Sequence, residues 1–448
     1  MSQFTALHFS LIAGVLVTAL LIGHLLRQRR SPAATLGWII FMVSAPWLAV
    51  PAYLMLGTRK LKSQILPALQ FVPVEVDLPL ARILASAGVP PPREGNQVVW
   101  DHDGPAAWEA LCTVVASSTA TLDVALYLLH NDVRGGQFIA QLAARAQAGV
   151  RVRLLLDGIG SMQVLRRNLR RLRATGVETA WFIPVLHRPS RGRTNMRNHR
   201  KLVIADGARA WSGGRNVGDE YFAADNVWID LSFTIAGPAA SDLARLFAAD
   251  WAFATKKPIE AATDIPAHAG TQTVQIVPSG PTLARDTLQE LLLTACYGAQ
   301  HRILIATPYF IPDEALQQAL VLAARRGVAV SLFLPRRSNH RLADIARTRY
   351  LRDLIAAGAT IRVLPEAMLH AKAVLADDLA LAGSANMDLR SLFLNFEVNG
   401  LFLSPADSQA LANWFDRLAA RTVNYLPAPS RLGLGLVEGL VLLVAFQI

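Results

Sequence analysis

Cysteine and charged side chains are both scarce in this sequence. Only Cys112 and Cys296 occur among 448 residues, too few for a disulfide framework or a cysteine-ligated metal site. Both stand in apolar, helix-like runs, and we interpret them as buried core thiols. Charged residues make up 17% of the chain and hydrophobic residues 52%, whereas about a quarter of the residues in ordinary soluble domains are charged. This imbalance indicates contact with lipid.

Acidic residues are outnumbered by basic ones, 33 against 44, and the formal net charge is +11. A strongly positive chain suits nucleic acid or an anionic membrane surface, because both present dense phosphate. Charge alone does not choose between these two partners.

The N-terminal region lacks charge over two long runs. Residues 4–26 contain no Asp, Glu, Lys or Arg, and this run exceeds the ~20 residues that a helix needs to cross a bilayer. A second uncharged run covers residues 33–56. We predict a transmembrane α-hairpin over residues 1–62, within which Pro46 and Pro51 kink the second span or make it re-entrant. A cleaved signal peptide is the alternative, but its basic residues would precede the apolar run, and here they follow it.

The hairpin predicts a multi-pass protein of the cell (inner) membrane and returns the chain to the side on which it started. Three basic residues on each flank give no orientation, and we expect the catalytic body on the cytoplasmic side. Residues 63–100 are expected to be a linker. The C-terminal segment 428–448 contains another apolar stretch, residues 432–448, which Glu438 alone interrupts. This stretch is short for a span, so we expect it to lie along the membrane surface or in a core.

Between the hairpin and the tail, the sequence repeats itself. Each copy has an apolar strand pattern, a helical pattern that ends at glycine, and a further β-branched strand; these cover residues 122–157 in the first copy and 302–335 in the second. Alternation of strands and helices predicts an α/β fold with a parallel or mixed sheet. We expect two similar halves, residues 101–260 and 261–427, packed as one pseudo-twofold body.

Each copy also contains a His-x-Lys-x4-Asp pattern. The first copy has His199, Lys201 and Asp206, and the second has His370, Lys372 and Asp377. One such pattern is weak evidence, because isolated histidines are common in cores and on surfaces. Two copies at corresponding points of a repeat make chance a poor explanation.

Residues i and i+2 of a strand point to the same face, so each His and its Lys are expected to enter one cleft together. A segment of small residues follows each strand. In it, Gly214 and Asn216 of the first copy, and Ser384 and Asn386 of the second, are candidates for binding phosphate through backbone N–H groups and side-chain amides.

Two imidazoles around one phosphorus suit phosphodiester transfer. One neutral His attacks phosphorus, while the other donates a proton to the leaving alcohol and then accepts one from the incoming hydroxyl. Lysines and asparagines stabilise charge on the phosphate oxygens. The motifs lack the carboxylate cluster of a magnesium site, so we expect no metal and no cofactor.

The aspartates of the motifs have a weaker case. We expect Asp206 and Asp377 to hold strands rather than take part in chemistry. Six residues separate Asp206 from Gly213, and five separate Asp377 from Gly383. The second return hairpin is therefore expected to be one residue shorter, and Asp378 is the alternative to Asp377.

Glu220 and Glu397 follow the two small-residue segments. Each is a candidate to accept a hydrogen bond from a catalytic imidazole and fix its tautomer; a solvated or salt-bridged carboxylate is the alternative. Trp228 and Asp230 stand in the segment VWIDLSF, for which we assign no role.

These paired motifs resemble those of the phospholipase D superfamily. The segments GGRNVGDEY, TPYFIPDE and GSANMDLRS, with the N-terminal hairpin, are similar to the bacterial cardiolipin synthases within it. The resemblance implies a phosphohistidine intermediate and the joining of two phosphatidylglycerol molecules into cardiolipin with release of glycerol. It implies that His199 is the nucleophile and His370 the acid and base; exchanging the two leaves the chemistry unchanged. Phosphatidylglycerol, other anionic phospholipids and the membrane are the expected partners.

Two other functions use the same fold. Hydrolysis of phospholipid shares the intermediate and differs only in the acceptor. A nucleic-acid phosphodiesterase would use the positive charge, but the hairpin and the lack of aromatic-rich basic segments argue against it, and we expect no nucleic acid. The basic run 187–201, which has no acidic residue, is either a solvated loop or a collar for anionic headgroups.

Overall fold

The computed structural model describes residues 3–28, 32–61, 79–164, 166–184, 194–224, 228–258, 264–426 and 432–443. The chain divides into two compact units. One comprises Met1–Leu61 with Val185–Met196, and the other comprises Lys62–Pro184 with Arg197–Ile448. Each unit is described by itself.

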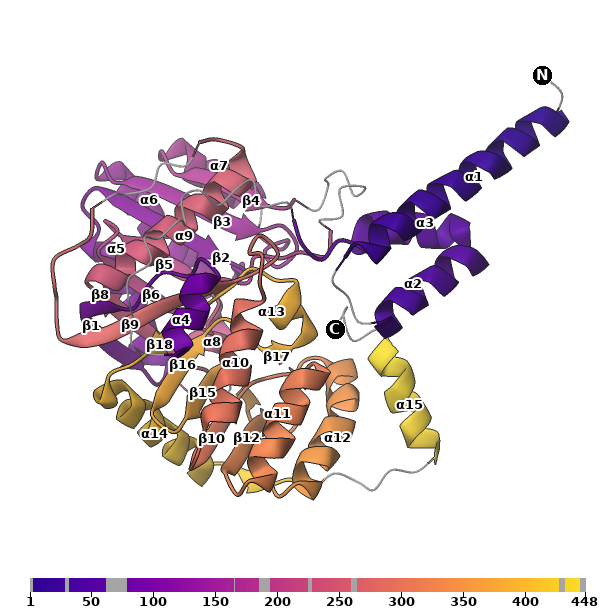
Figure 1. Cartoon of the computed structure of the whole chain (residues 1–448). Coiled ribbons are helices and arrows are strands. Elements are labelled where there is room, and N and C mark those ends of the chain that lie inside the picture. Colours follow the sequence, from indigo (N-terminus) through magenta and orange to yellow (C-terminus); the bar gives the residue numbers. More distant parts are fainter. Residues whose placement is uncertain are drawn as a thin grey trace. The chain divides into compact units, whose positions relative to one another are not determined.

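The smaller unit is helical and contains α1 (Gln3–Leu26), α2 (Pro32–Ser44) and α3 (Pro46–Leu56) (Figure 1). The second apolar run is thus two helices that meet at Ala45, since Pro46 has no N–H to continue α2 and instead begins α3. Leu25, Met42 and Tyr53 are buried against one another. Across the described ranges, no helix meets the length and hydropathy needed to cross a membrane. The transmembrane hairpin stays a prediction.

The larger unit is built on one mixed sheet of 15 strands. From the edge of the second half, the strands come in the order β19 (Val423–Asn424), β13 (Thr360–Leu364), β12 (Ala329–Pro335), β10 (Arg302–Ala306), β15 (Ala373–Ala376), β16 (Leu379–Gly383), β18 (Glu397–Phe402) and β9 (Gln272–Ser279). The first half continues the sheet with β1 (Arg93–Asp101), β8 (Ser232–Ala236), β6 (Arg209–Gly213), β5 (Leu202–Ala205), β2 (Thr121–Leu126), β3 (Arg151–Asp157) and β4 (Glu178–Phe182).

Seven strands of each half come in the same order when the sheet is read outward from the β9–β1 pair, and β19 at the edge of the second half has no counterpart. In each half three neighbouring strands, β10, β12 and β13 or β2, β3 and β4, are parallel, and the four strands nearer the β9–β1 pair are antiparallel. Strand β19 pairs with β13 in the antiparallel direction. The prediction of two similar α/β halves with a mixed sheet therefore matches the architecture. The predicted linker 63–100 differs, because β1 and the helix α4 (Pro79–Ser86) belong to the body.

Helices cover the sheet. The first half has α5 (Gly104–Ser117), α6 (Val133–Gln147), α7 (Arg166–Ala174), the short α8 (Asp219–Phe222) and α9 (Pro238–Thr255). The second half has α10 (Thr287–Gly298), α11 (Glu314–Arg325), α12 (Arg341–Ala356), the short α13 (Leu389–Phe393) and α14 (Pro405–Ala420), followed by α15 (Leu432–Leu443).

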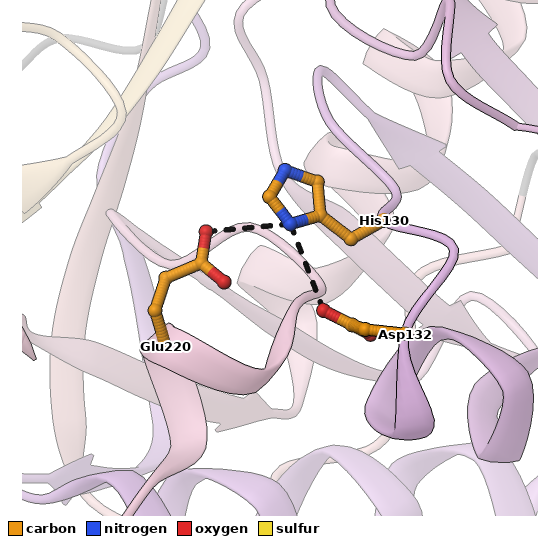
Figure 2. A group of neighbouring side chains, drawn as sticks. All are labelled: His130, Asp132 and Glu220. Atoms are coloured by element: carbon orange, nitrogen blue, oxygen red, sulfur yellow. Dashed lines mark ion pairs between the residues drawn. The ribbon is translucent and has the colours of Figure 1, made fainter.

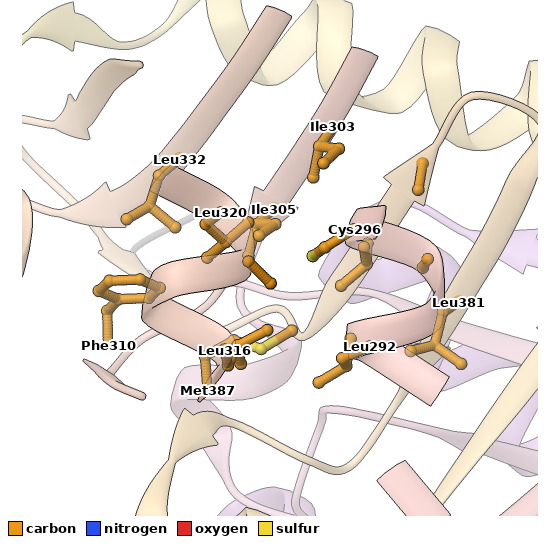
Figure 3. Packing of buried hydrophobic residues seen from close by; sticks show 14 of the residues in the cluster. Leu292, Cys296, Ile303, Ile305, Phe310, Leu316, Leu320, Leu332, Leu381 and Met387 are labelled. Atoms are coloured by element: carbon orange, nitrogen blue, oxygen red, sulfur yellow. The ribbon is translucent and has the colours of Figure 1, made fainter. Parts of the chain in front are cut away.

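Each half has its own hydrophobic core under these helices. In the second half, side chains of α10 and α11, among them Leu292 and Leu320, meet Ile303, Ile305 and Leu332 of the sheet (Figure 3). Cys296 lies in this core, as predicted, and burial raises the pKa of its thiol to about 12. Cys112 in α5 is only half-buried and accepts a hydrogen bond from Gln141, so its interpretation as a core thiol was wrong.

Two short pairings cross from one half to the other. Strand β7 (Trp228–Ile229) pairs with β14 (Met368–Leu369), and Asn198 bridges to Phe396. The crossing segments lie next to the His-x-Lys motifs. The halves are thus interlocked at the point where the chemistry was predicted.

The C-terminal helix α15 is in contact with α12. The Glu438 carboxylate is buried and pairs with the Arg352 guanidinium, with 3.0 Å between Oε1 and Nη1, while Leu436 and Leu440 are exposed. The single charge in the apolar tail therefore faces protein, and an apolar face remains outside.

A buried ion pair holds β2 to β3. Asp123 accepts two hydrogen bonds of 2.7 Å from the Arg153 guanidinium, which also stacks over the rings of Phe247 and Trp251 in α9. We expect Asp123→Ala to lower the free energy of unfolding by about 3–5 kcal/mol, because it leaves a buried cation without its partner. Chemical denaturation measures this loss. The double variant Asp123→Leu/Arg153→Met is the control and should be more stable than Asp123→Ala; a lower stability would contradict the explanation.

Candidate active site

The two His-x-Lys motifs lie directly before β5 and β15, and the backbone of each is bound to the opposite half. The His199 N–H donates to the Phe396 carbonyl at 2.9 Å, and the His370 N–H donates to the Ile229 carbonyl at 2.7 Å. Each motif is therefore positioned by a strand that belongs to the other copy of the repeat.

The imidazole rings are oriented in the same reciprocal way. His199 Nδ1 lies 3.0 Å from Glu397 Oε2, and His370 Nδ1 lies 2.6 Å from Asp230 Oδ2. A carboxylate only accepts, so Nδ1 of each ring carries the hydrogen and Nε2 carries the lone pair. Glu397 directly follows Phe396, and Asp230 directly follows Ile229, so the two carboxylates occupy equivalent positions.

Glu397 is one of the two carboxylates that the sequence suggested for this contact. The other, Glu220, pairs instead with His130 at 3.4 Å (Figure 2). Asp230 takes the place expected of Glu220, and sequence analysis assigned it no role. The available signal was its position directly after an apolar residue that pairs with the opposite half, Ile229, just as Glu397 follows Phe396.

The lysines of the motifs are buried beside their histidines. Lys201 Nζ donates to the His199 carbonyl at 2.7 Å. Lys372 Nζ donates to the His370 carbonyl and lies 2.7 Å from Nδ1 and 3.1 Å from Nε2 of the same ring. Both ammonium groups thus bind the backbone carbonyl of their own histidine, and Lys372 also contacts the His370 ring.

Burial sets the protonation of these groups. It lowers the pKa of His199 to about 4, against the opposing Glu397 carboxylate, and the pKa of His370 to about 3, where Lys372 lowers it further and Asp230 opposes. The pKa of Lys201 is well below its usual value, and that of Lys372 falls to about 8. Both imidazoles are therefore neutral at neutral pH.

The two halves also influence each other electrostatically. Burial has the largest effect on the pKa of each histidine. In addition, Lys372 of the second half lowers the pKa of His199, and Lys201 of the first half lowers the pKa of His370. Glu397 and Asp230 both raise the pKa of both lysines. The two motifs therefore lie close enough to influence each other's charge.

The four predicted phosphate ligands have varied contacts. An added Cβ at Gly214 would lie 2.1 Å from Asp230 Oδ1, so this glycine makes room for the carboxylate. Its counterpart Ser384 donates from Oγ to Glu397 Oε2 at 2.5 Å. Both residues therefore support the carboxylates that bind the imidazoles.

The two asparagines have their amide oxygens buried. Asn216 donates from Nδ2 to the Tyr221 hydroxyl at 2.9 Å, and the Tyr221 ring lies 5.3 Å from the His370 ring. Within the part of the chain that the structure describes, Oδ1 of Asn216 and Oδ1 of Asn386 have no hydrogen-bond partner. These atoms retain capacity for a ligand.

The two motif aspartates lie away from the imidazoles, at the opposite ends of β5 and β15. Asp206 accepts from the N–H groups of residues 119–121, before β2, and Asp377 accepts from those of residues 300–302, before β10. Both have positive φ angles, 52° and 50°. Their environments are equivalent, so Asp377, not Asp378, matches Asp206, and both hold strand ends. The second hairpin is one residue shorter, as predicted.

Two buried arginines bind the backbone of Glu397 and Asp230, and neither arginine was predicted from the sequence to do so. Arg200 Nε donates to the Glu397 carbonyl at 3.0 Å, and Arg215 Nη2 donates to the Asp230 carbonyl at 2.6 Å. Arg200 also pairs with Asp250 at 2.5 Å. In the basic run 187–201, Arg197 is buried too and lies 3.6 Å from Asp157. Arg197 and Arg200 of this run are therefore structural. Residues 187–193 of the run lie outside the described ranges.

Comparison with known proteins identifies the family. The family described as "Cardiolipin synthase, PLD-like domain" matches residues 111–251 and 292–419, one segment in each half. The chain belongs to this cardiolipin synthase family. Both matched segments contain a complete His-x-Lys motif and the carboxylate that serves the opposite half.

Named relatives cover most of the chain. The major cardiolipin synthase ClsA of Bacillus subtilis is 34% identical over 344 residues, which is 74% of this chain and 71% of the relative. Cardiolipin synthase A of Pseudomonas entomophila is 31% identical over 419 residues, 86% of this chain and 85% of the relative. The crystal structure of phosphatidylserine synthase from Haemophilus influenzae has a TM-score of 0.62 at 14% identity and covers 79% of this chain and 95% of that one. The fold of the cardiolipin synthase family is therefore shared with that enzyme.

The hydrogen bonds that Asp206 accepts allow a test of whether this aspartate has a structural or a chemical role. Partial burial raises the pKa of Asp206, but the backbone N–H donors outweigh it and lower the pKa overall. We expect Asp206→Ala to lower the free energy of unfolding by about 1 kcal/mol at pH 7, a value typical of lost caps. The difference in the free energy of unfolding should persist above ~pH 4, the pKa of Asp206 in the unfolded chain. It should shrink as pH falls through the lower pKa of Asp206 in the folded protein. Asp378→Ala, whose side chain caps no strand, is the matched control in urea denaturation; equal losses would contradict the assignment.

Proposed function

We propose that the protein is a cardiolipin synthase that transfers a phosphatidyl group from one phosphatidylglycerol to another and releases glycerol. The observation that carries this proposal is the reciprocal pair of imidazoles. Each is neutral, each is held at Nδ1 by a carboxylate of the opposite half, and each directs Nε2 away from that carboxylate. Membership of the cardiolipin synthase family supports the choice of substrate class.

In the first step, His199 Nε2 attacks the phosphorus of one phosphatidylglycerol. A P–N bond forms, the bond between phosphorus and the glycerol oxygen breaks, and His370 donates a proton to that oxygen. Glu397, bonded to His199 Nδ1, stabilises the positive charge that develops on the ring. The products of this step are phosphohistidine and free glycerol.

In the second step, His370 accepts the proton of the hydroxyl of a second phosphatidylglycerol. The resulting oxygen attacks phosphorus, the P–N bond breaks, and cardiolipin leaves with His199 restored. The equivalent surroundings of the two rings make the reverse assignment of roles chemically identical, and the order chosen follows the superfamily. Lys201 and Lys372 stabilise the non-bridging oxygens in both steps.

The acid role requires a proton on His370, whose pKa burial lowers to about 3 in the free protein. A bound phosphodiester brings a negative charge next to the ring and raises this pKa. Asp230, which accepts from Nδ1, favours the imidazolium in the same direction. The substrate therefore induces the protonation state that its own cleavage needs.

The smaller helical unit is proposed as the membrane anchor, with the hairpin spanning the inner membrane and the catalytic unit on the cytoplasmic side. Its described helices expose large apolar side chains, including Leu16, Leu20 and Trp47. Such exposure is costly in water and suits lipid. Both substrates and the product are lipids, so an enzyme held at the bilayer meets them where they are dissolved.

The function is tested by incubating the purified full chain with phosphatidylglycerol in mixed micelles and following lipids by mass spectrometry. We expect cardiolipin and glycerol in equal amounts. Phosphatidic acid as the sole product would show hydrolysis instead, and the absence of both would refute phospholipid chemistry.

Removal of either imidazole tests the two-histidine mechanism. We expect His199→Ala and His370→Ala each to lower turnover at least ~1,000-fold, because nucleophile and acid act as one unit. His301→Ala, at an exposed histidine outside the site, is the matched control and should retain wild-type turnover. Turnover retained in either motif variant would contradict the mechanism.

The lowered pKa of Lys372 predicts a pH dependence. Its ammonium is present below about pH 8 and lost above it, so kcat/KM should fall as pH rises past this value, because kcat/KM reports the free enzyme. The guanidinium of Lys372→Arg stays charged, and its alkaline decline should move to higher pH even if its maximum is lower. An unchanged midpoint in this variant would exclude Lys372 as the titrating group.

A further inference from the structure

Among the described residues, one group of side chains outside the motifs is arranged as metal ligands: His130, Asp132 and Glu220 (Figure 2). His130 Nδ1 lies 3.4 Å from Glu220 Oε1 and 3.6 Å from Asp132 Oδ2. All three ligand atoms lie within 4.8 Å of one another, and all three residues are half-buried.

These separations match a zinc site. Zinc binds imidazole nitrogen and carboxylate oxygen at about 2.1 Å in a tetrahedron, which places neighbouring ligand atoms about 3.4 Å apart. The separations of 3.4 and 3.6 Å from His130 Nδ1 are close to this value, and the two carboxylates lie within 4.8 Å of each other, so an ion would draw the carboxylates toward this spacing. A water molecule would complete the four ligands.

The backbone around the group is already fixed. The His130 N–H donates to the Val217 carbonyl at 2.8 Å. Asp132 accepts from the Gly135 N–H as the cap of α6, and from the Asp219 N–H at the start of α8, both at 2.8 Å. A carboxylate has about four acceptor positions, so these bonds orient Asp132 and leave it able to bind an ion.

The second copy of the repeat shows that the fold does not require this group. The Leu129–Val217 bridge of the first half corresponds to the β11 (Phe310–Ile311) and β17 (Met387–Asp388) pairing of the second. Counting from these pairs, His130, Asp132 and Glu220 correspond to Ile311, Asp313 and Arg390. Asp313 caps α11 as Asp132 caps α6, so only the aspartate has a shared structural role.

A glycine keeps the space between the ligands open. An added Cβ at Gly218 would lie 3.0 Å from both His130 Nδ1 and Glu220 Oε2. The φ angle of Gly218 is −172°, a conformation open to any residue, so the backbone does not demand glycine here. The absence of a side chain is explained by the room that an ion would occupy.

We propose that His130, Asp132 and Glu220 form a zinc-binding site of the first half, separate from the catalytic histidines. Zinc at this position ties the start of α6 to α8. Tyr221, the residue after Glu220, contacts the His370 ring and accepts from Asn216. The ion therefore stiffens the segment that supports one wall of the active site.

A protonated His130 between two carboxylates is the competing explanation of the same geometry, and zinc binding separates the two. The untagged full chain, stripped with a chelator, is titrated with ZnCl2 by calorimetry at pH 7. We expect one strong site per chain, at least tenfold weakened in Glu220→Gln and in His130→Asn. Gly218→Ala, which leaves all three ligands intact and fills the space between them, should weaken binding similarly.

The control is His301→Asn, at an exposed histidine outside the group of three, and it should bind zinc as the wild type does. Circular dichroism establishes that each variant is folded, and zinc should raise the thermal midpoint of the wild type but not of Glu220→Gln. Absence of a strong site in the wild type, or equal affinity in all four variants, would overturn the proposal and leave an ion-pair cluster. Neither result bears on cardiolipin synthesis, which is assayed separately.

Discussion

The structure depends on one exchange: each half of the chain lends a carboxylate to the imidazole of the other. Glu397 binds His199, and Asp230 binds His370. Neither imidazole would be fixed in one tautomer by its own half. The same strands also supply the carbonyl groups that bind the backbone of each histidine, so ring orientation and the packing of the halves are a single arrangement. Phosphoryl chemistry at this site is possible only when the halves are interlocked.

Burial of so many charges would be unfavourable without this exchange. Two imidazoles, two ammonium groups and two carboxylates are removed from water together, and desolvation is the largest influence on the pKa of each lysine and each histidine. Their charges compensate one another, and buried Arg200 and Arg215 bind the backbone of the carboxylate residues. With both imidazoles neutral, the two ammonium groups balance the two carboxylates. Electrostatic preorganisation of this kind requires little further movement in the transition state.

The repeat made the body predictable from sequence, because helix, glycine and strand recur with the same spacing, and the His-x-Lys pairs stand at equivalent points. Contacts between distant segments were harder. Asp230 has no local motif, and its role appears only when β7 crosses to β14. Glu220 follows the small-residue segment, where a carboxylate that binds a catalytic imidazole was expected. The short helix α8 nevertheless places its carboxylate against His130. Arg200 looked like part of a solvated basic run, and tertiary ion pairing with Asp250 overrode that pattern.

The antiparallel seam of β9 and β1 has a consequence for ancestry. Apart from β19, the strand order is the same outward from it on both sides, which is the geometry of an isologous contact between two identical subunits. A one-copy precursor of this protein would have possessed a histidine without its carboxylate, and a carboxylate without its histidine, until it met another molecule of itself. With both copies in one chain, each position can differ between them without disturbing a symmetric contact, as His130 and Glu220 do from their counterparts Ile311 and Arg390.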